Sequence, residues 1–359
     1  MKKILICTGG TGGHIFPAIS LAEYLEKKNF NVDFITDYRA KKFINNINLK
    51  KINFINVKTP TGKKGIGLIY SIFLIFISFL YSIFFLLLKK PQLIIGSGGY
   101  VSFPILLAAK LLKKKFVIYE TNSVVGRVNK FFLNSSTKIF TGYPLKNLNI
   151  SNDKVTFVGQ LIREQIYLAK ENNYFKKDDN FDFTLLIIGG SQGAEIFSKT
   201  LPQSLNKLFN LNKKIRIFHQ VGNKEQEFKI DLSYKNNSNV TIFNFEPNIE
   251  KYMTLSDLVI TRAGSSTLSE LAFLEIPFIA IPFKESLDNH QFYNADYFFR
   301  MNACWLIDQQ DLNSEKLFDL VKELMLSKEK LLEKKSKLKE LTKTDVNEIF
   351  EKEINKILS

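Results

Sequence analysis

The sequence of 359 residues is poor in cysteine, and this shortage limits where and how the protein folds. Its two cysteines, Cys7 and Cys304, cannot form a disulfide framework, so a reducing compartment is the natural home of the chain. A secretory signal is not expected, because only Ile4 to Cys7 separate the N-terminal lysines from Thr8 and a run of glycines. The length predicts two domains, and the 45% of hydrophobic residues is enough for sizeable cores.

Residues that bind metals are scarce as well. The three histidines, His14, His219 and His290, are far apart in the chain, and no Asp-x-Asp pair occurs. A tight metal site needs several such ligands brought together. We therefore expect neither a metal site nor a cofactor.

Acidic residues are rare in one half of the chain only. Residues 1–163 contain 24 basic and 6 acidic residues, whereas residues 164–359 contain 26 and 29. A general bias of composition toward lysine would not remove acids from one half, so this half is expected to meet an anionic partner. Nucleic acid, a phosphorylated substrate and an anionic membrane surface all fit. Nucleic acid is not expected, because no recognised binding motif occurs and the glycine-rich loops described below would have no role.

Charge is absent altogether between Lys63-Lys64 and Lys89-Lys90. The segment Gly65–Leu88 is long and apolar enough for a helix that crosses a membrane. A core helix and a helix lying in the membrane interface are the other interpretations. Ser71, Ser78 and Ser82 form a weakly polar stripe on one helical face, and a membrane span would split the sheet predicted around it. We therefore expect the stripe to pack on the domain and the apolar face to meet lipid, with a span as the alternative.

The rest of the chain alternates short apolar strands with helical patterns, which predicts an α/β protein with two doubly wound, Rossmann-like domains facing each other across a cleft. A charged, Asn-rich stretch at residues 159–183 divides the two series. We expect an N-terminal domain at residues 1–160 that meets acceptor and membrane, and a nucleotide-binding domain at residues 161–340. Residues 341–359 form a C-terminal helix that can return to the first domain. Ligands bind at the carboxyl ends of such strands, so function is sought in the loops there.

The first of three glycine-rich loops runs from Gly9 to His14, between a strand and a helix. It matches neither the dinucleotide fingerprint nor the P-loop. Its missing side chains would let a ligand approach the backbone amides closely. The structural alternative is a tight turn with a histidine that merely packs.

The second loop, Gly189 to Gly193, also joins a strand to a helix and would present free N–H groups to a phosphate or diphosphate. The same residues spell G-x-S-x-G, the nucleophile elbow of hydrolases. A serine hydrolase, with Ser191 as nucleophile and Asp257 or Asp288 with His290 as partners, is therefore an alternative from another class.

The third loop follows a strand that ends at Thr261. Thr267 to Glu270 match a capping box, in which Glu270 would return to the amide of Thr267. In the functional interpretation, Glu270 is a carboxylate in the first helical turn that accepts hydrogen bonds from a ribose diol. The sequence permits either role.

Five motifs, taken together and in this order, resemble the MurG family: GGTGGHIFPA, GSGGYVS, GGSQGA, TRAGSSTLSE and HQFYNA. The resemblance covers nearly the whole chain. It implies a GT-B glycosyltransferase that moves N-acetylglucosamine from UDP-GlcNAc to lipid I, the undecaprenyl-diphosphate-linked muramoyl-pentapeptide, and so makes lipid II for peptidoglycan. It also implies a peripheral protein on the cytoplasmic side of the cell membrane. A related enzyme that glycosylates another lipid, such as diacylglycerol, is the nearest alternative.

The resemblance also implies the residues that contact UDP-GlcNAc. In it, Asn122 contacts the transferred sugar, Arg163 approaches the diphosphate, and Glu246 stands where family members hold uracil by backbone groups. Glu270 meets the ribose and Gln291 the sugar. The full donor set is Thr11, Gly12, Gly13, Asn122, Arg163, Ser191, Glu246, Ser265, Ser266, Thr267, Leu268, Ser269, Glu270 and Gln291.

The chain departs from the family pattern at three places, two of which include residues of this set. The usual His-Glu-Gln-Asn reads Tyr119-Glu120-Thr121-Asn122 here, and the usual Gly-Asn-Pro-x-Arg reads Gly159-Gln160-Leu161-Ile162-Arg163. The usual YVSGP reads YVSFP. Asn122 and Arg163 survive, so we expect an intact donor site and altered surroundings.

The reaction implied by the resemblance inverts the anomeric centre, because the acceptor hydroxyl attacks opposite the departing UDP. Amides around Ser191 and the helix dipole would stabilise the leaving diphosphate. The hydroxyl must lose a proton, and histidine titrates in the right range, so we predict His14 as the general base. Glu120 is the acid of the first half that lies near a candidate loop, and it is the alternative.

Overall fold

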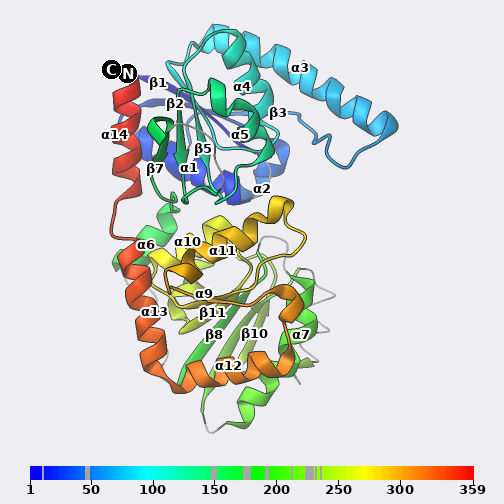
Figure 1. Cartoon of the computed structure of the whole chain (residues 1–359), viewed down its shortest axis with the longest axis vertical. Coiled ribbons are helices and arrows are strands. Elements are labelled where there is room, and N and C mark those ends of the chain that lie inside the picture. Colours follow the sequence, from blue (N-terminus) through cyan, green and yellow to red (C-terminus); the bar gives the residue numbers. More distant parts are fainter. Residues whose placement is uncertain are drawn as a thin grey trace. The chain divides into compact units, whose positions relative to one another are not determined.

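The apolar runs of the sequence form two parallel sheets in the computed structural model, one in each of two units of the chain (Figure 1). Unit 1 comprises residues 1–163 and 345–359, and unit 2 comprises residues 164–344. The structure describes residues 1–9, 12–44, 49–146, 152–172, 179–190, 194–211, 213–222, 230, 233–234 and 237–359. The predicted α/β class with two parallel sheets is confirmed.

Unit 1 contains a seven-stranded parallel sheet in the order β3-β2-β1-β4-β5-β6-β7. The order reverses beside β1, where Ile4 pairs with Val32 on one side and with Leu93 on the other. Loops that follow the strands flanking such a reversal are the usual place for a ligand. The strands are β1 (Lys3–Cys7), β2 (Asn31–Asp37), β3 (Ile52–Ile55), β4 (Leu93–Gly96), β5 (Phe116–Glu120), β6 (Lys138–Thr141) and β7 (Val155–Phe157).

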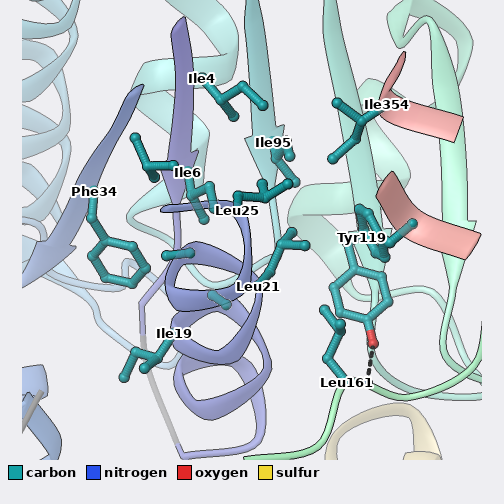
Figure 2. Packing of buried hydrophobic residues seen from close by; sticks show 14 of the residues in the cluster. Ile4, Ile6, Ile19, Leu21, Leu25, Phe34, Ile95, Tyr119, Leu161 and Ile354 are labelled. Atoms are coloured by element: carbon teal, nitrogen blue, oxygen red, sulfur yellow. Dashed lines mark hydrogen bonds between the residues drawn. The ribbon is translucent and has the colours of Figure 1, made fainter. Parts of the chain in front are cut away.

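Helices cover both faces of this sheet, because alternate residues of its strands point to opposite sides. Ile4 and Ile6 face one hydrophobic cluster, part of which Figure 2 shows, and Leu5 and Cys7 face another. The helices of unit 1 are α1 (Gly12–Lys27), α2 (Lys41–Ile44), α3 (Gly65–Lys89), α4 (Ser102–Leu111), α5 (Arg127–Phe132) and α14 (Val346–Leu358), with short 3-10 turns η1 (Tyr38–Ala40), η2 (Leu133–Ser135) and η3 (Asn152–Lys154).

Helix α3 is the long apolar segment of the sequence, and its polar stripe faces the unit. Ser71, Ser78 and Ser82 are buried, and the Ser78 hydroxyl donates to the carbonyl of Asn56 at 3.2 Å. By length and composition the helix could cross a membrane, and 28% of its most apolar window is buried. However, β3 precedes it and β4 follows it, and both strands lie in one sheet. The membrane-spanning alternative is therefore wrong, since a span would place these two strands on opposite sides of the bilayer.

Unit 2 contains a six-stranded parallel sheet in the order β10-β9-β8-β11-β12-β13, which reverses beside β8. Its strands are β8 (Phe183–Ile188), β9 (Ile215–Gln220), β10 (Val240–Phe243), β11 (Leu258–Thr261), β12 (Phe278–Ala280) and β13 (Trp305–Leu306). Its helices are α6 (Glu164–Asn172), α7 (Glu195–Asn206), α9 (Glu250–Leu255), α10 (Ser265–Phe273), α11 (His290–Arg300), α12 (Ser314–Leu326) and α13 (Lys328–Leu341), with 3-10 turns η4 (Lys207–Asn210), η5 (Leu287–Asn289) and η6 (Gln309–Asp311). One hydrophobic cluster joins these strands to α7 and α12.

The C-terminal helix α14 belongs to unit 1 (Figure 1). Phe350 and Ile354 are buried in the cluster that includes α1. The hydroxyl of Tyr24 donates to Glu351 at 2.7 Å, and the ammonium of Lys2 donates to Asn355 at 3.0 Å. The chain thus leaves unit 1 after Arg163 and returns to it at Asp345. The sequence had predicted these two boundaries a few residues earlier, after residues 160 and 340.

Candidate active site

In unit 1, the loops after β1, β4 and β5 meet around His14, in the first turn of α1. The carbonyl of His14 accepts hydrogen bonds from the hydroxyls of Thr8 at 3.1 Å and Ser97 at 3.4 Å. The ring nitrogen Nδ1 of His14 lies 3.2 Å from Oγ1 of Thr121, which follows β5. Gly98 has a φ of +92°, and a Cβ there would lie 3.1 Å from the His14 ring. The positive φ favours glycine at this position, and the close approach of the ring leaves little room for a side chain. Three loops thus contact His14, two at its backbone carbonyl and one at its imidazole.

Glu120 ends β5 and is completely buried. One carboxylate oxygen accepts hydrogen bonds from the backbone and side-chain amides of Asn122, at 3.0 and 3.3 Å. The other accepts from the amide of Gly126 at 2.9 Å and from Nδ2 of Asn129 at 2.8 Å. Four donors around a buried carboxylate organise the loop after β5 and hold Asn122. This role argues against the alternative that Glu120 is the base. The sequence had not predicted that Glu120 holds the loop of Asn122.

Asn122 and Arg163, two residues predicted to contact UDP-GlcNAc, contact Thr121 and Phe16 respectively. Nδ2 of Asn122 donates to Oγ1 of Thr121 at 3.3 Å, the same oxygen that contacts His14. The guanidinium of Arg163 lies over the ring of Phe16, 4.8 Å from its centre. Gly12 and Gly13 begin α1, and Thr11 lies outside the described residues.

In unit 2, the third glycine-rich loop ends at the N-terminus of α10. Gly264 is the N-cap residue, the helix begins at Ser265, and the amide of Leu268 is bonded to the carbonyl of Gly264 at 3.0 Å. The predicted capping box is therefore wrong, because Thr267 is inside the helix. Glu270 accordingly lies in the second turn rather than the first, and it is buried. The helix starts three residues before the pattern suggested because Gly264 has the extended backbone that an N-cap needs.

The start of α10 has the features of an anion site. The amides of Ser265, Ser266 and Thr267 belong to the first turn, where a helix leaves its N–H groups without carbonyl partners inside the helix. The Ser266 hydroxyl is buried and has no hydrogen-bond partner within the part of the chain that the structure describes. Leu268 and Ser269, the next two residues of the helix, are also buried.

Two side chains fix the loops after β11 and β12 to each other. Oε1 of Gln291 accepts hydrogen bonds from the amides of Ala263 at 3.2 Å and Phe283 at 2.9 Å. The guanidinium of Arg262 donates to the carbonyls of Ile281 and Pro282, both at 3.1 Å. Burial lowers the pKa of Arg262 to about 10, so it stays charged at neutral pH. Sequence reasoning missed Arg262 as a site residue, although a charged residue directly after a buried strand was a usable signal.

The remaining predicted residues lie on other loops of unit 2. Glu246 follows β10, and its carboxylate accepts a hydrogen bond from the amide of Asn248 at 2.9 Å. Gly189, after β8, donates its amide to Oε1 of Gln220 at 3.1 Å, and Ser191 lies outside the described residues. Among the residues that the structure describes, no group of three or more His, Cys, Asp or Glu is placed to hold a metal ion.

The geometry also argues against the hydrolase alternative. Asp257 accepts a hydrogen bond from the amide of Thr184 at 2.8 Å, and Thr184 is at the start of β8. Asp257 therefore lies at the start of β8, whereas Ser191 follows the end of β8 in the sequence and lies outside the described residues. Nδ1 of His290, the nitrogen that a catalytic aspartate would hold, lies 2.8 Å from the carbonyl of Leu287.

With this geometry described, comparison with known proteins gives the family. Residues 4–141 match the glycosyltransferase family 28 N-terminal domain, and residues 184–349 match the glycosyltransferase family 28 C-terminal domain. The chain belongs to glycosyltransferase family 28. Within the family it is similar to a protein of Pelagibacter ubique (strain HTCC1062), with 37% identity over 94% of each chain, and to one of Rickettsia felis (strain ATCC VR-1525 / URRWXCal2), with 36% identity over 93% of each. Both relatives are named UDP-N-acetylglucosamine--N-acetylmuramyl-(pentapeptide) pyrophosphoryl-undecaprenol N-acetylglucosamine transferase.

Solved structures agree with this family 28 membership. MurG of Acinetobacter baumannii matches with a TM-score of 0.73 and 26% identity, over 95% of each chain. The UDP-GlcNAc 2-epimerase of Neisseria meningitidis, solved with UDP-GlcNAc bound, matches with a TM-score of 0.68 and 13% identity, over 93% of this chain and 94% of that one, and this shows a shared fold alone. The predicted resemblance to the MurG family and the GT-B fold are confirmed.

Proposed function

We propose that this family 28 glycosyltransferase transfers N-acetylglucosamine from UDP-GlcNAc to lipid I, with inversion at the anomeric carbon, and thereby forms lipid II. The observation that carries the proposal is the 37% identity, over 94% of both chains, with a relative named for this transfer. A match of that extent includes the loops of both units, where the candidate site residues lie.

In this proposal, the loops of unit 2 bind the donor. The first-turn amides of α10, at Ser265 to Thr267, and the positive end of the helix dipole stabilise negative charge on the nucleotide. Glu270 accepts hydrogen bonds from the ribose hydroxyls, the loop of Glu246 holds the uracil, and Gln291 keeps the loops after β11 and β12 in place beside the sugar. The amides around Ser191 contact the diphosphate.

His14 of unit 1 is the general base of the proposed reaction. The 4-hydroxyl of the acceptor sugar attacks the anomeric carbon, the bond from that carbon to UDP breaks, and UDP leaves with the electron pair. The hydroxyl proton passes to Nε2 of His14, because Nδ1 is held by Thr121. Asn122, fixed by Glu120, contacts the transferred sugar, and Arg163 offsets charge on the diphosphate.

We propose further that unit 1 associates peripherally with the cytoplasmic face of an anionic membrane through α3. Much of this helix is exposed: Phe73 is 56%, Phe76 is 53% and Phe84 is 62% exposed. Figure 1 shows the N-terminal half of α3 extending away from the rest of unit 1. Lysine pairs flank the helix at both ends, so acyl chains would meet its apolar side chains while anionic headgroups meet its ends.

A transfer assay tests the proposed function. We would incubate the full chain with labelled UDP-GlcNAc and a short-chain lipid I analogue, with UDP-glucose as control donor and diacylglycerol as control acceptor. Transfer from UDP-GlcNAc to the lipid I analogue alone is expected. Transfer to diacylglycerol would mean a related enzyme with another acceptor, and no binding of UDP-GlcNAc would overturn the proposal entirely.

A further inference from the structure

Tyr119 is a fully buried tyrosine of β5 whose hydroxyl has several partners in the segment after β7. The hydroxyl donates to Oε1 of Gln160 at 2.6 Å, and it accepts a hydrogen bond from the amide of Leu161 at 3.1 Å (Figure 2). Its ring packs edge-on against Phe350 of α14, with 5.2 Å between the ring centres. The strand, the segment that leaves unit 1 and the returning C-terminal helix therefore meet at one side chain.

Gln160 continues this network toward the candidate base. Its Nε2 donates to the backbone carbonyl of Thr121 at 2.8 Å, and the side chain is buried. A Cβ on Gly142 would lie 2.5 Å from Oε1 of Gln160, so the glutamine occupies space that only glycine leaves. Gln160 is thus held at both ends, by Tyr119 and by Thr121.

Thr121 is the link to His14. Its backbone is bonded to Gln160, and its Oγ1 lies 3.2 Å from Nδ1 of the imidazole. Hydrogen bonds therefore join Tyr119 to Gln160 and Gln160 to the backbone of Thr121, and the side chain of the same threonine contacts His14. A group that holds one ring nitrogen of a histidine sets both the orientation and the tautomer of the ring.

We propose that Tyr119 and Gln160 are positioning residues that hold Thr121, and through it fix the imidazole of His14 for proton transfer. This inference rests on the proposed function, because it takes His14 to be the base. Three of the residues involved, with Leu161, stand where the sequence departs from the family pattern. Proline, usual at position 161, has no N–H to donate, whereas Leu161 donates to the Tyr119 hydroxyl. These four departures thus form one mutually bonded set rather than separate losses.

The test compares two tyrosine variants. Tyr119→Phe removes the hydroxyl and leaves the ring on Phe350. Tyr24→Phe removes the hydroxyl that ties α1 to Glu351 of α14 and leaves Gln160 untouched, so it controls for looser packing of α14. We expect Tyr119→Phe to lower kcat about five- to tenfold, because Gln160 loses its partner and Thr121 is held less firmly, with KM for UDP-GlcNAc unchanged. Tyr24→Phe should leave kcat unchanged. Equal effects of the two variants, or a rise in KM alone, would overturn the inference.

A second variant keeps the test open if Tyr119→Phe fails to fold. Gln160→Met retains the length of the side chain but removes both hydrogen bonds, and we expect the same fall in kcat. Because the two residues act through one path, the double variant should be no slower than the slower single variant. Fully additive losses would show that they act separately and would contradict the proposal.

A measurement without turnover separates this inference from the proposed function. The chain has three histidines, so ¹⁵N NMR of labelled protein resolves their ring nitrogens, and His14→Asn assigns the His14 signals. We expect Tyr119→Phe to change the His14 tautomer ratio and Tyr24→Phe to leave it unchanged. If the wild type makes no lipid II but this change occurs, the proposed function fails, whereas the inference that Tyr119 and Gln160 position the imidazole of His14 stands. Unchanged His14 signals in Tyr119→Phe would overturn the inference whatever the activity.

Discussion

The two units share an architecture but differ in what they show to solvent. Both are parallel sheets with an order reversal, beside β1 in unit 1 and beside β8 in unit 2. Residues 1–163 of unit 1 carry 24 basic and 6 acidic residues, whereas unit 2, residues 164–344, carries 24 and 25. Unit 1 also exposes the apolar side of α3. In the proposed function one fold therefore serves two partners, because the loops and the surface decide the partner while the sheet only positions them.

Three of the acidic residues of unit 1 are placed where they build structure. Glu120 is buried under four donors, and α14 returns with Glu351 and Glu353, which lie 3.6 Å from Lys28 and Lys138. The lysines near α3 are left without such carboxylates in the local sequence, so the surface there stays positive. The two units therefore differ mainly in the charged and apolar side chains that they expose, and substitutions in each unit can test this difference separately.

The largest effect is expected from two variants, of which one should lower kcat and the other should raise KM. His14→Ala in unit 1 should lower kcat by about 10³, the usual contribution of a general base, and leave KM for UDP-GlcNAc within about twofold. Glu270→Gln in unit 2 is the matched variant, and it should raise KM about tenfold, since it weakens hydrogen bonds to the ribose. Steady-state kinetics of both variants check this. If His14→Ala raised KM as much as it lowered kcat, His14 would be a positioning residue for the donor.

Much of this contrast could be predicted from the sequence. Continuous apolar runs such as those of β1 and β8 predict buried parallel strands, and the serine spacing predicted which face of α3 is buried. The two-residue strand β13 was not predicted, because it carries too few residues for a periodic signal. Strand β3 was not predicted either, because an asparagine interrupts its apolar residues and most of it is only partly buried. The capping box was misassigned because Gly264 caps as well as threonine does, and the local pattern cannot rank them.

The network around His14 could not be predicted at all. Tyr119, Gln160 and Leu161 look like isolated departures in the sequence, since position 119 and position 161 are far apart in the chain. Their contacts depend on β5 and β7 lying in one sheet with only β6 between them. Contacts across a sheet follow from topology, and the order of strands in a parallel sheet is not written in any single strand.

The second largest effect is expected on membrane binding, which substitutions in unit 1 should weaken and substitutions in unit 2 should not. Replacing both Phe76 and Phe84 by serine removes two exposed aromatic rings from α3, and we expect binding to anionic vesicles to weaken about 100-fold. Phe299→Ser in unit 2 is the control, because Phe299 is 51% exposed, about as much as Phe76 at 53%. Co-sedimentation with vesicles of anionic and neutral lipid measures the effect. Unchanged binding by the double variant would show that α3 does not meet the bilayer.

The smallest effect concerns stability in acid, and it should be confined to unit 2. His219 is fully buried there, with Nδ1 2.9 Å from the hydroxyl of Tyr234, and burial lowers the pKa of His219 from 6.5 to about 3. Below pH 6.5 the unfolded chain binds a proton that the folded unit does not bind. The free energy of unfolding therefore falls as the pH drops through this range, by about 2 kcal/mol at pH 5 relative to neutral pH.

Trp305 makes this prediction measurable, because the only tryptophan of the chain lies in β13 of unit 2. Urea unfolding followed by its fluorescence reports unit 2 at each pH. His219→Gln removes the titrating ring and should abolish the loss between pH 7 and pH 5, whereas His290→Gln, which changes the other histidine of unit 2, should retain it. Should His219→Gln lose as much stability in acid as the wild type, a group other than His219 would be responsible. The acid sensitivity of unit 2 would then have to arise from carboxylates, which are far more numerous in this unit than in unit 1.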